Sequence, residues 1–341
     1  MKVPVYVISG FLGSGKTTIL LNLLKECEKN NQRPGIILNE LGEINVESHM
    51  FKDQNIQELL NGCICCSIQD DLKETLDYFA NEAKENNIDV LFIEGTGVAN
   101  PIEIEEVLLN NKYLEIFQLQ SMISLVDASN YLEYQSIFSS TAEVRKLLQE
   151  QISSATFVLL NKADLVKEKT LSKIENKVKD QVRPLVPVIQ TTFGEVSMQE
   201  LLKKRYTVVQ LETAENSTDG KGNGHSHDHH HEHKHNHNHS TINALKIDNP
   251  PEVNRGKLEK WLKKMPANVL LRGKGIISLE NNKGLYTFQF SSGKLAMKKL
   301  LEEEASNQPT IILIGNSLNR DEILESFNRN FVKTKRLLNR R

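Results

Sequence analysis

The chain has few cysteines, one tryptophan, little net charge and no long apolar run. Its 341 residues carry 42 Lys and Arg against 44 Asp and Glu, and a formal charge of −2 excludes a general attraction to nucleic acid or anionic lipid. No stretch approaches the roughly 18 apolar residues that span a bilayer, and the first predicted strand starts at Val3 without a cationic leader. We therefore expect a cytoplasmic protein with neither nucleic-acid nor membrane partners.

The four cysteines are unevenly placed: three lie in Cys63-Ile64-Cys65-Cys66, and the other is Cys27. This differs from the spread pairs of a secreted disulfide scaffold. Three thiols so close cannot all form relaxed mutual disulfides, whereas thiolates on one loop converge readily on an ion such as Zn²⁺. Small buried hydrophobic cysteines are the alternative. The C-x-C-C pattern beside Gly62 favours metal, while Cys27 is predicted to lie in the core.

From Val3 to about Leu202, short β-branched runs alternate with amphipathic helical stretches, which predicts a parallel sheet covered by helices on both faces. The best strand candidates are Val5–Ile8, Gly35–Leu38, Val90–Ile93, Met122–Val126 and Phe157–Leu160. Apolar residues then nearly vanish between Glu212 and Ser240. Such a segment buries too little apolar surface to offset its ordering entropy, so a flexible linker is predicted.

A second alternation begins at Thr241 and predicts a smaller α+β domain with helices on one face of a largely antiparallel sheet. Strands are predicted near Leu245 and over Val269–Leu279, Tyr286–Phe290 and Thr310–Ile314, and helices over Leu258–Met265, over Lys294–Glu303 and after Arg320. The predicted organisation is therefore an α/β domain at 1–211, a His-rich linker at 212–240 and an α+β domain at 241–341.

The segment from Gly10 to Thr17 matches G-x-x-x-x-G-K-[ST], directly after a predicted strand and before a helix expected from Thr18 to about Lys29. Glycines let backbone N–H groups converge on phosphates, and the helix N-terminus adds partial positive charge. Lys16 is expected to bridge the β- and γ-phosphates, and the Thr17 hydroxyl to bind Mg²⁺. The predicted nucleotide contacts in this loop are Gly10, Gly13, Ser14, Gly15, Lys16, Thr17 and Thr18.

The tetrapeptide Asn161-Lys162-Ala163-Asp164 ends another predicted strand, and N-K-x-D after a phosphate loop favours GTP over ATP. Asp164 is expected to accept hydrogen bonds from the guanine N1–H and exocyclic amine. Asn161 is expected to brace the loop, and the Lys162 stem to lie over the base. Thr191–Gly194 is a candidate for backbone contacts to the base edge, although such a run is more often only a turn.

A second acidic element lies in Leu91–Gly97, where a hydrophobic strand ends at Glu94. This carboxylate can orient the water shell of Mg²⁺, so Glu94 joins Lys16 and Thr17 as a catalytic candidate. Gly97 can place an N–H near the γ-phosphate, which would let the segment sense hydrolysis. Asp127 ends the next predicted strand and is expected to brace a turn rather than catalyse.

Nine of the ten histidines lie between His225 and His239. Neutral imidazoles favour Zn, Ni, Co and Cu ions, and a flexible string collects them without a preformed cage. An expression tag is the alternative, but tags are usually terminal and uninterrupted, whereas this tract is internal and mixed. The predicted ligands in it are His225, His227, His229, His231, His233, His235, His237 and His239.

These motifs make the chain resemble the CobW-type metallochaperone branch of P-loop GTPases, which includes zinc-transfer GTPases, cobalamin-pathway members and nitrile hydratase activators. The resemblance covers nearly the entire chain. The matching segments are Gly10–Thr18 (GFLGSGKTT), Asn39–Glu43 (NELGE), Asn61–Cys66 (NGCICC), Glu94–Gly97 (EGTG), Asn161–Asp164 (NKAD) and, in the carboxy-terminal domain, Leu271–Gly275.

The resemblance implies a P-loop sheet domain followed by a CobW C-terminal-like domain, and a GTPase that uses GTP and Mg²⁺ to handle a transition metal. Zn²⁺ is the favoured ion, with Co²⁺ or Ni²⁺ as alternatives. Cys63, Cys65 and Cys66 are implied to bind the cargo. Glu40 and Glu43 are implied to lie in a nucleotide-responsive switch and are added to the candidate metal ligands. The carboxy-terminal domain is implied to help dock a client apo-metalloprotein.

Two other functions stay open at this point. One is a metal buffer or sensor whose slow GTP turnover is a conformational timer, and the other is a cobalt chaperone for cobalamin biosynthesis. In either case the cysteine loop follows the switch segment, so phosphate-dependent movement of that segment would change the ligands or the exposure of the metal. The client, the residue that positions water and the oligomeric state stay open as well, a homodimer included.

Overall fold

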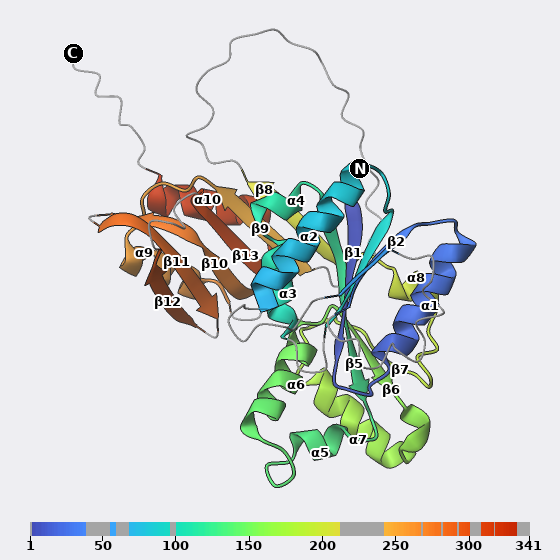
Figure 1. Cartoon of the computed structure of the whole chain (residues 1–341). Coiled ribbons are helices and arrows are strands. Elements are labelled where there is room, and N and C mark those ends of the chain that lie inside the picture. The colour runs from blue at the N-terminus through green and yellow to red at the C-terminus, as the bar shows by residue number, and fades with distance from the viewer. Residues whose placement is uncertain are drawn as a thin grey trace, which may run out of the picture. The chain divides into compact units, whose positions relative to one another are not determined.

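The computed structural model describes residues 2–38, 55–58, 68–95, 100–211, 242–266, 269–280, 282–291, 293–300, 308–316 and 318–332. The chain divides into two compact units, Met1–Thr207 and Val208–Arg341 (Figure 1). The linker predicted at 212–240 lies outside the described residues. Within the described ranges, none of the helices combines the length and the apolar character that a bilayer crossing requires.

The first unit is built on a seven-stranded parallel sheet in the order β3-β2-β4-β1-β5-β6-β7. Its strands are β1 (Val3–Gly10), β2 (Pro34–Leu38), β3 (Asn55–Glu58), β4 (Val90–Glu94), β5 (Phe117–Asp127), β6 (Phe157–Asn161) and β7 (Val188–Gln190). The five predicted strands are confirmed as β1, β2, β4, β5 and β6, which are apolar runs buried along nearly their whole length. The short, polar β3 carries no such pattern and was not predicted.

Helices cover both faces of this sheet, as predicted (Figure 1). On one face α1 packs with Ile36, Phe92 and Leu159. On the other face α5, α6 and α7 pack against Val158 and Leu160. The helices are α1 (Lys16–Lys29), α2 (Ile68–Lys84), α3 (Pro101–Leu108), α4 (Asn111–Leu114), α5 (Tyr131–Gln135), α6 (Ala142–Ser154), α7 (Glu168–Lys179) and α8 (Met198–Leu201), and Ala163–Leu165 forms the 3-10 turn η3.

Two predictions concern the helix α1, its starting residue and the burial of Cys27. It starts at Lys16, two residues earlier than predicted, so its first turn follows Gly15 directly. Its buried face includes Cys27, which is 1% exposed, and the prediction of a core cysteine is confirmed. Burial raises the pKa of the Cys27 thiol to about 11, so this sulfur stays protonated at neutral pH and is a poor metal ligand.

The second unit holds a six-stranded sheet in the order β12-β11-β10-β13-β9-β8. The pairs from β12 through to β9 are antiparallel. Its elements are β8 (Tyr206–Leu211), β9 (Ile242–Asp248), α9 (Arg255–Lys264), β10 (Leu270–Leu279), β11 (Asn282–Ser291), β12 (Lys294–Lys299), β13 (Thr310–Asn316) and α10 (Arg320–Phe331). Both helices pack on one core with Leu245, Ile311 and Leu313, which confirms the predicted α+β arrangement.

The helix predicted over Lys294–Glu303 is wrong. Lys294–Lys299 forms β12, which pairs with β11, and residues 301–307 lie outside the described ranges. Leu295 and Met297 pack against the core while Lys294, Ala296 and Lys298 are exposed, which is the period of a strand. Ala, Met, Lys, Leu and Glu are strong helix formers, but pairing with β11 and burial of alternate side chains override that propensity.

We predict that Phe327→Ala destabilises the second unit by about 3–5 kcal/mol, because it removes a fully buried ring. The ring contacts Trp261 edge to face, with 5.4 Å between centroids, and Trp261 is the one tryptophan of the chain. Urea unfolding followed by tryptophan fluorescence therefore reports on this unit. Phe92→Ala, which removes a ring from the first core, is the matched control and should leave that transition in place. A loss below about 1 kcal/mol for Phe327→Ala would contradict the prediction.

Candidate nucleotide site at the carboxyl edge of the first sheet

The phosphate loop joins the central strand β1 to α1. Its glycines are needed for two reasons, a positive φ and the lack of space for a side chain. Gly10, Gly13 and Gly15 have φ of +143°, +72° and +105°, where other residues are strained. A Cβ at Gly10 would lie 2.4 Å from the Leu125 carbonyl oxygen, and one at Gly15 would lie 2.4 Å from Asn161 Nδ2. Neighbouring strands β5 and β6 therefore leave no room for side chains at Gly10 and Gly15.

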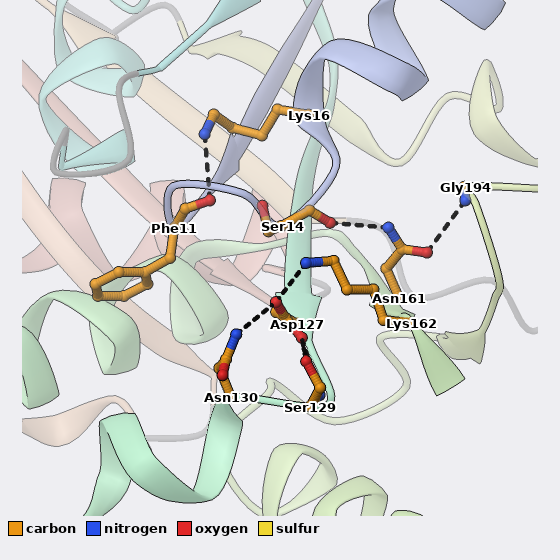
Figure 2. Close-up of polar contacts among 9 residues, drawn as sticks. All are labelled: Phe11, Ser14, Lys16, Asp127, Ser129, Asn130, Asn161, Lys162 and Gly194. Carbon is orange, nitrogen blue, oxygen red and sulfur yellow. Dashed lines mark hydrogen bonds and ion pairs between the residues drawn. The ribbon is translucent and has the colours of Figure 1, made fainter. Parts of the chain in front are cut away.

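The start of α1 fits an anion. Gly15 is its N-cap and offers no side-chain hydrogen bond, and the first turn contains no acidic residue. Ser14 is fully buried, and its Oγ has no hydrogen-bond partner among the described residues. Lys16 is also buried, and its Nζ donates to the Phe11 carbonyl oxygen at 3.3 Å (Figure 2). A positive helix end, an unsatisfied hydroxyl and an ammonium group together suit a phosphate.

Asn161 joins the phosphate loop to the N-K-x-D segment. Its Nδ2 donates to the Ser14 carbonyl oxygen at 2.8 Å, and its Oδ1 accepts from the Gly194 N–H at 3.1 Å (Figure 2). The residue ends β6 and is 3% exposed. One buried side-chain amide thus connects the loops that follow β1, β6 and β7.

Lys162 and Asp127 form an ion pair that the sequence did not predict. Lys162 has φ of +58°, and its Nζ lies 2.8 Å from Asp127 Oδ2 (Figure 2). Asp127 also accepts from the N–H and hydroxyl of Ser129 and from Asn130 Nδ2. Burial raises the pKa of the Asp127 carboxyl, but the hydrogen bonds from Lys162, Ser129 and Asn130 outweigh burial and leave that pKa below its ordinary value. The carboxylate is therefore charged at neutral pH.

Two further predicted residues lie at the same sheet edge. Glu94 ends β4, is nearly buried and is in register with Ile8 near the end of β1. Asp164 lies in η3 just beyond β6 and is exposed. Because the carboxyl ends of parallel strands meet at one edge, the fold brings these carboxylates to the edge that carries the phosphate loop. Thr17 there is half-buried and Thr18 is exposed.

The run Thr191–Gly194 forms a turn after β7. The Thr191 hydroxyl donates to the Glu195 carbonyl oxygen at 2.7 Å, and the Thr191 carbonyl accepts from the Ala163 N–H at 3.2 Å. Within this turn Phe193 has φ of +53° and is 75% exposed.

The remaining predicted site residues lie outside the described residues. They are Glu40, Glu43, Cys63, Cys65, Cys66, Gly97, His225, His227, His229, His231, His233, His235, His237 and His239. In the part of the chain that is described, no three His, Cys, Asp or Glu side chains gather closely enough to hold a metal ion.

A phosphate loop after the central strand β1 of a parallel sheet, with N-K-x-D at the end of β6 two strands away, defines a P-loop nucleotide-binding protein. The model of the CobW/HypB/UreG nucleotide-binding domain matches residues 4–190. The model of the cobalamin synthesis protein cobW C-terminal domain matches residues 242–330. The chain belongs to the CobW/HypB/UreG family and carries the CobW C-terminal domain.

Several curated proteins are similar to the chain. Zinc-regulated GTPase metalloprotein activator 1 of Dictyostelium discoideum is 31% identical, with 59% of this chain and 48% of that protein covered. Zinc chaperone CobW of Sinorhizobium sp is 28% identical, with 59% and 62% covered. Zinc chaperone YjiA of Escherichia coli strain K12 is 31% identical, with 58% and 59% covered. The chain thus spans about half to three-fifths of the length of these curated relatives.

Among solved structures, Zn(II)-bound YjiA GTPase from E. coli is 23% identical, with 97% of this chain and 99% of that chain covered. The TM-score is 0.42.

We predict that Gly15→Ala lowers the free energy of unfolding by about 2–4 kcal/mol and Gly13→Ala by about 1 kcal/mol. Both positions have positive φ, but a Cβ at Gly13 meets nothing within 4 Å, whereas one at Gly15 meets Asn161 Nδ2. Urea unfolding followed by circular dichroism without nucleotide separates the cost of the positive φ from the cost of the collision with Asn161. Equal losses for the two variants would show that the approach to Asn161 does not constrain Gly15.

Proposed function

We propose that the chain is a GTP-hydrolysing metallochaperone that binds a transition metal, with zinc favoured, and transfers it to a client metalloprotein. The observation that carries the proposal is the Asn161 bridge, because it joins a phosphate loop and an N-K-x-D segment into one site. Family membership supports the metal cargo, and so do the names of the relatives, which are zinc chaperones and a zinc-regulated GTPase metalloprotein activator.

In this proposal the first turn of α1 holds the phosphates. The backbone N–H groups from Gly13 to Thr18 face the anion, and the Lys16 ammonium neutralises charge on the β- and γ-phosphates. Thr17 and Glu94 are oxygen donors at the same sheet edge and would hold Mg²⁺, directly or through water. When bound, that ion supplies positive charge against the oxygens of the transferred phosphoryl group.

The guanine base is read at the other end of the site. Asp164, exposed in η3, would accept from the N1–H and the exocyclic amine of guanine. Adenine presents neither donor at those positions, so the carboxylate selects GTP over ATP. Asn161 keeps this segment next to the phosphate loop.

The metal would be held by Cys63, Cys65 and Cys66, with Glu40 and Glu43 in the nucleotide-responsive segment before them. The start of this segment is close to the nucleotide, because Leu38, at the end of β2, is in register with Glu94 on β4. In this proposal movement after hydrolysis reaches the metal ligands through the chain between Leu38 and Cys63. We also propose that the histidines of 212–240 form a metal-collecting arm between a GTPase domain at 1–211 and a client-docking domain at 241–341.

We predict that Asp164→Asn exchanges guanine for xanthine selectivity. An asparagine side chain offers one donor and one acceptor, which match the O2 and N1–H of xanthine but not the two donors of guanine. The ratio of GTP to XTP affinity should fall by at least about 100-fold, measured by calorimetric titration of both nucleotides. Asp164→Ala is the control, and it should weaken GTP binding without strengthening XTP binding. Unchanged GTP affinity in Asp164→Asn would contradict guanine reading by Asp164.

The proposed coupling of metal and nucleotide is tested by zinc titration with a non-hydrolysable GTP analogue and with GDP. We predict that the two zinc dissociation constants differ, and that Cys65→Ser raises the constant by at least about tenfold while GDP still binds. Cys27→Ala is the matched control, since this thiol is buried in α1, and it should leave zinc affinity unchanged. Equal zinc constants in both nucleotide forms would count against the chaperone proposal and favour a simple metal buffer.

A further inference from the structure

The ion pair between Asp127 and Lys162 is not used by the phosphate binding, hydrolysis or guanine reading proposed above. We infer that Asp127 is a positioning residue that fixes the Lys162 side chain against the nucleotide base and thereby sets the affinity for guanine nucleotides. The inference rests on the proposed function, since it requires a nucleotide in this site.

The sheet register puts the two partners together. Asp127 ends β5 and Asn161 ends β6, and these two residues are register partners in adjacent parallel strands. Lys162 follows Asn161 at once, and its positive φ turns the chain away from the strand direction. The Lys162 ammonium then reaches the Asp127 carboxylate at 2.8 Å (Figure 2).

The burial of the pair is asymmetric. The Asp127 side chain is 2% exposed, whereas that of Lys162 is 32% exposed. The acid is therefore a fixed, buried anchor, while about a third of the Lys162 side chain stays open. In our inference the four-carbon stem of that side chain, held beside the residue that reads guanine, supplies an apolar contact for the face of a purine ring.

Asp127 affects nucleotide affinity because it orders the Lys162 stem before the nucleotide binds. A lysine side chain has a flexible four-carbon stem and loses much rotamer freedom when it is immobilised. Here the backbone end is fixed by the Asn161 bridge and the ammonium end by Asp127. The ordering cost falls on folding rather than on nucleotide binding, so binding is tighter than with an unanchored lysine.

Asp127 has a second set of partners that defines the competing explanation. It accepts from Ser129 and from Asn130, the residue before α5. The ring of Tyr134 in α5 stacks on Phe11 of the phosphate loop, with 4.9 Å between centroids. Loss of Asp127 would therefore weaken nucleotide binding through the phosphate loop if bracing of α5 were its role. Lys162 is, however, the one charged donor among these partners, and hydrogen bonds between charged groups are the stronger ones.

The two explanations separate in a double-mutant cycle on the full chain. The four proteins are the unaltered chain, Asp127→Asn, Lys162→Met and the double variant, and the probe is calorimetric titration with GDP. Lys162→Met keeps an apolar stem and removes the ammonium that Asp127 holds. We expect Asp127→Asn to lower the GDP affinity about tenfold in the unaltered background and less than about twofold in the Lys162→Met background.

Inorganic pyrophosphate is the second probe, because it occupies the phosphate loop and has no base. Asp127→Asn should change its affinity by less than about twofold if Asp127 acts through Lys162. Asp127→Glu, which keeps the charge, should retain GDP affinity within about threefold and also serves if Asp127→Asn does not fold. Thermal unfolding of each variant records any loss of stability separately.

The outcomes that overturn the inference are distinct from those that overturn the function. Equal GDP losses from Asp127→Asn in both backgrounds, or an equal loss of pyrophosphate binding, would assign Asp127 to the bracing of α5. If Asp127→Asn does not fold, a loss of GDP affinity in Asp127→Glu that persists in the Lys162→Met background would do the same. An unaltered chain that binds no GDP would overturn the proposed function, and the inference with it.

Discussion

The candidate site depends on one buried amide. Asn161 donates to the carbonyl of Ser14 and accepts from the N–H of Gly194, so it connects loops that are far apart in the sequence. Both contacts use backbone groups, so neither hydrogen bond requires a particular side chain at position 14 or 194. A primary amide suits this position because it offers a donor and an acceptor from one rigid plane. Removing it would take one hydrogen bond from each of two buried backbone groups, which is costlier than losing an exposed contact.

The same amide explains a constraint on the phosphate loop. Gly15 faces Asn161 Nδ2 so closely that even a methyl group would collide with it. Gly10 is equally confined by the Leu125 carbonyl on β5. The glycines of the motif are therefore required by the close approach of β5 and β6 as well as by the phosphates. The conformation of the phosphate loop thus depends on the positions of β5 and β6 as well as on its own sequence.

Much of the fold was predictable because its signals are local. Buried parallel strands are continuous apolar runs, and the phosphate loop and N-K-x-D are short motifs, so β1, β4, β5 and β6 could be assigned from the sequence alone. The helix predicted from Lys294 failed because pairing with β11, which no local propensity reports, decided its structure. The bond between Asp127 and Lys162 was missed for the same reason, since strand register brings together residues 35 positions apart.

The strand β12 has a further consequence for the protein in solution. It is the last strand in the order of the second sheet, so in the described part of the chain its outer backbone edge has no neighbouring strand. Such edges are where one chain can add to the sheet of another and begin aggregation. Lys294, Lys298 and Lys299 are exposed along it, and three positive charges side by side repel an identical edge. Lysines, which favour a helix by propensity, here place like charges along the backbone edge at which a second copy of the sheet would pair.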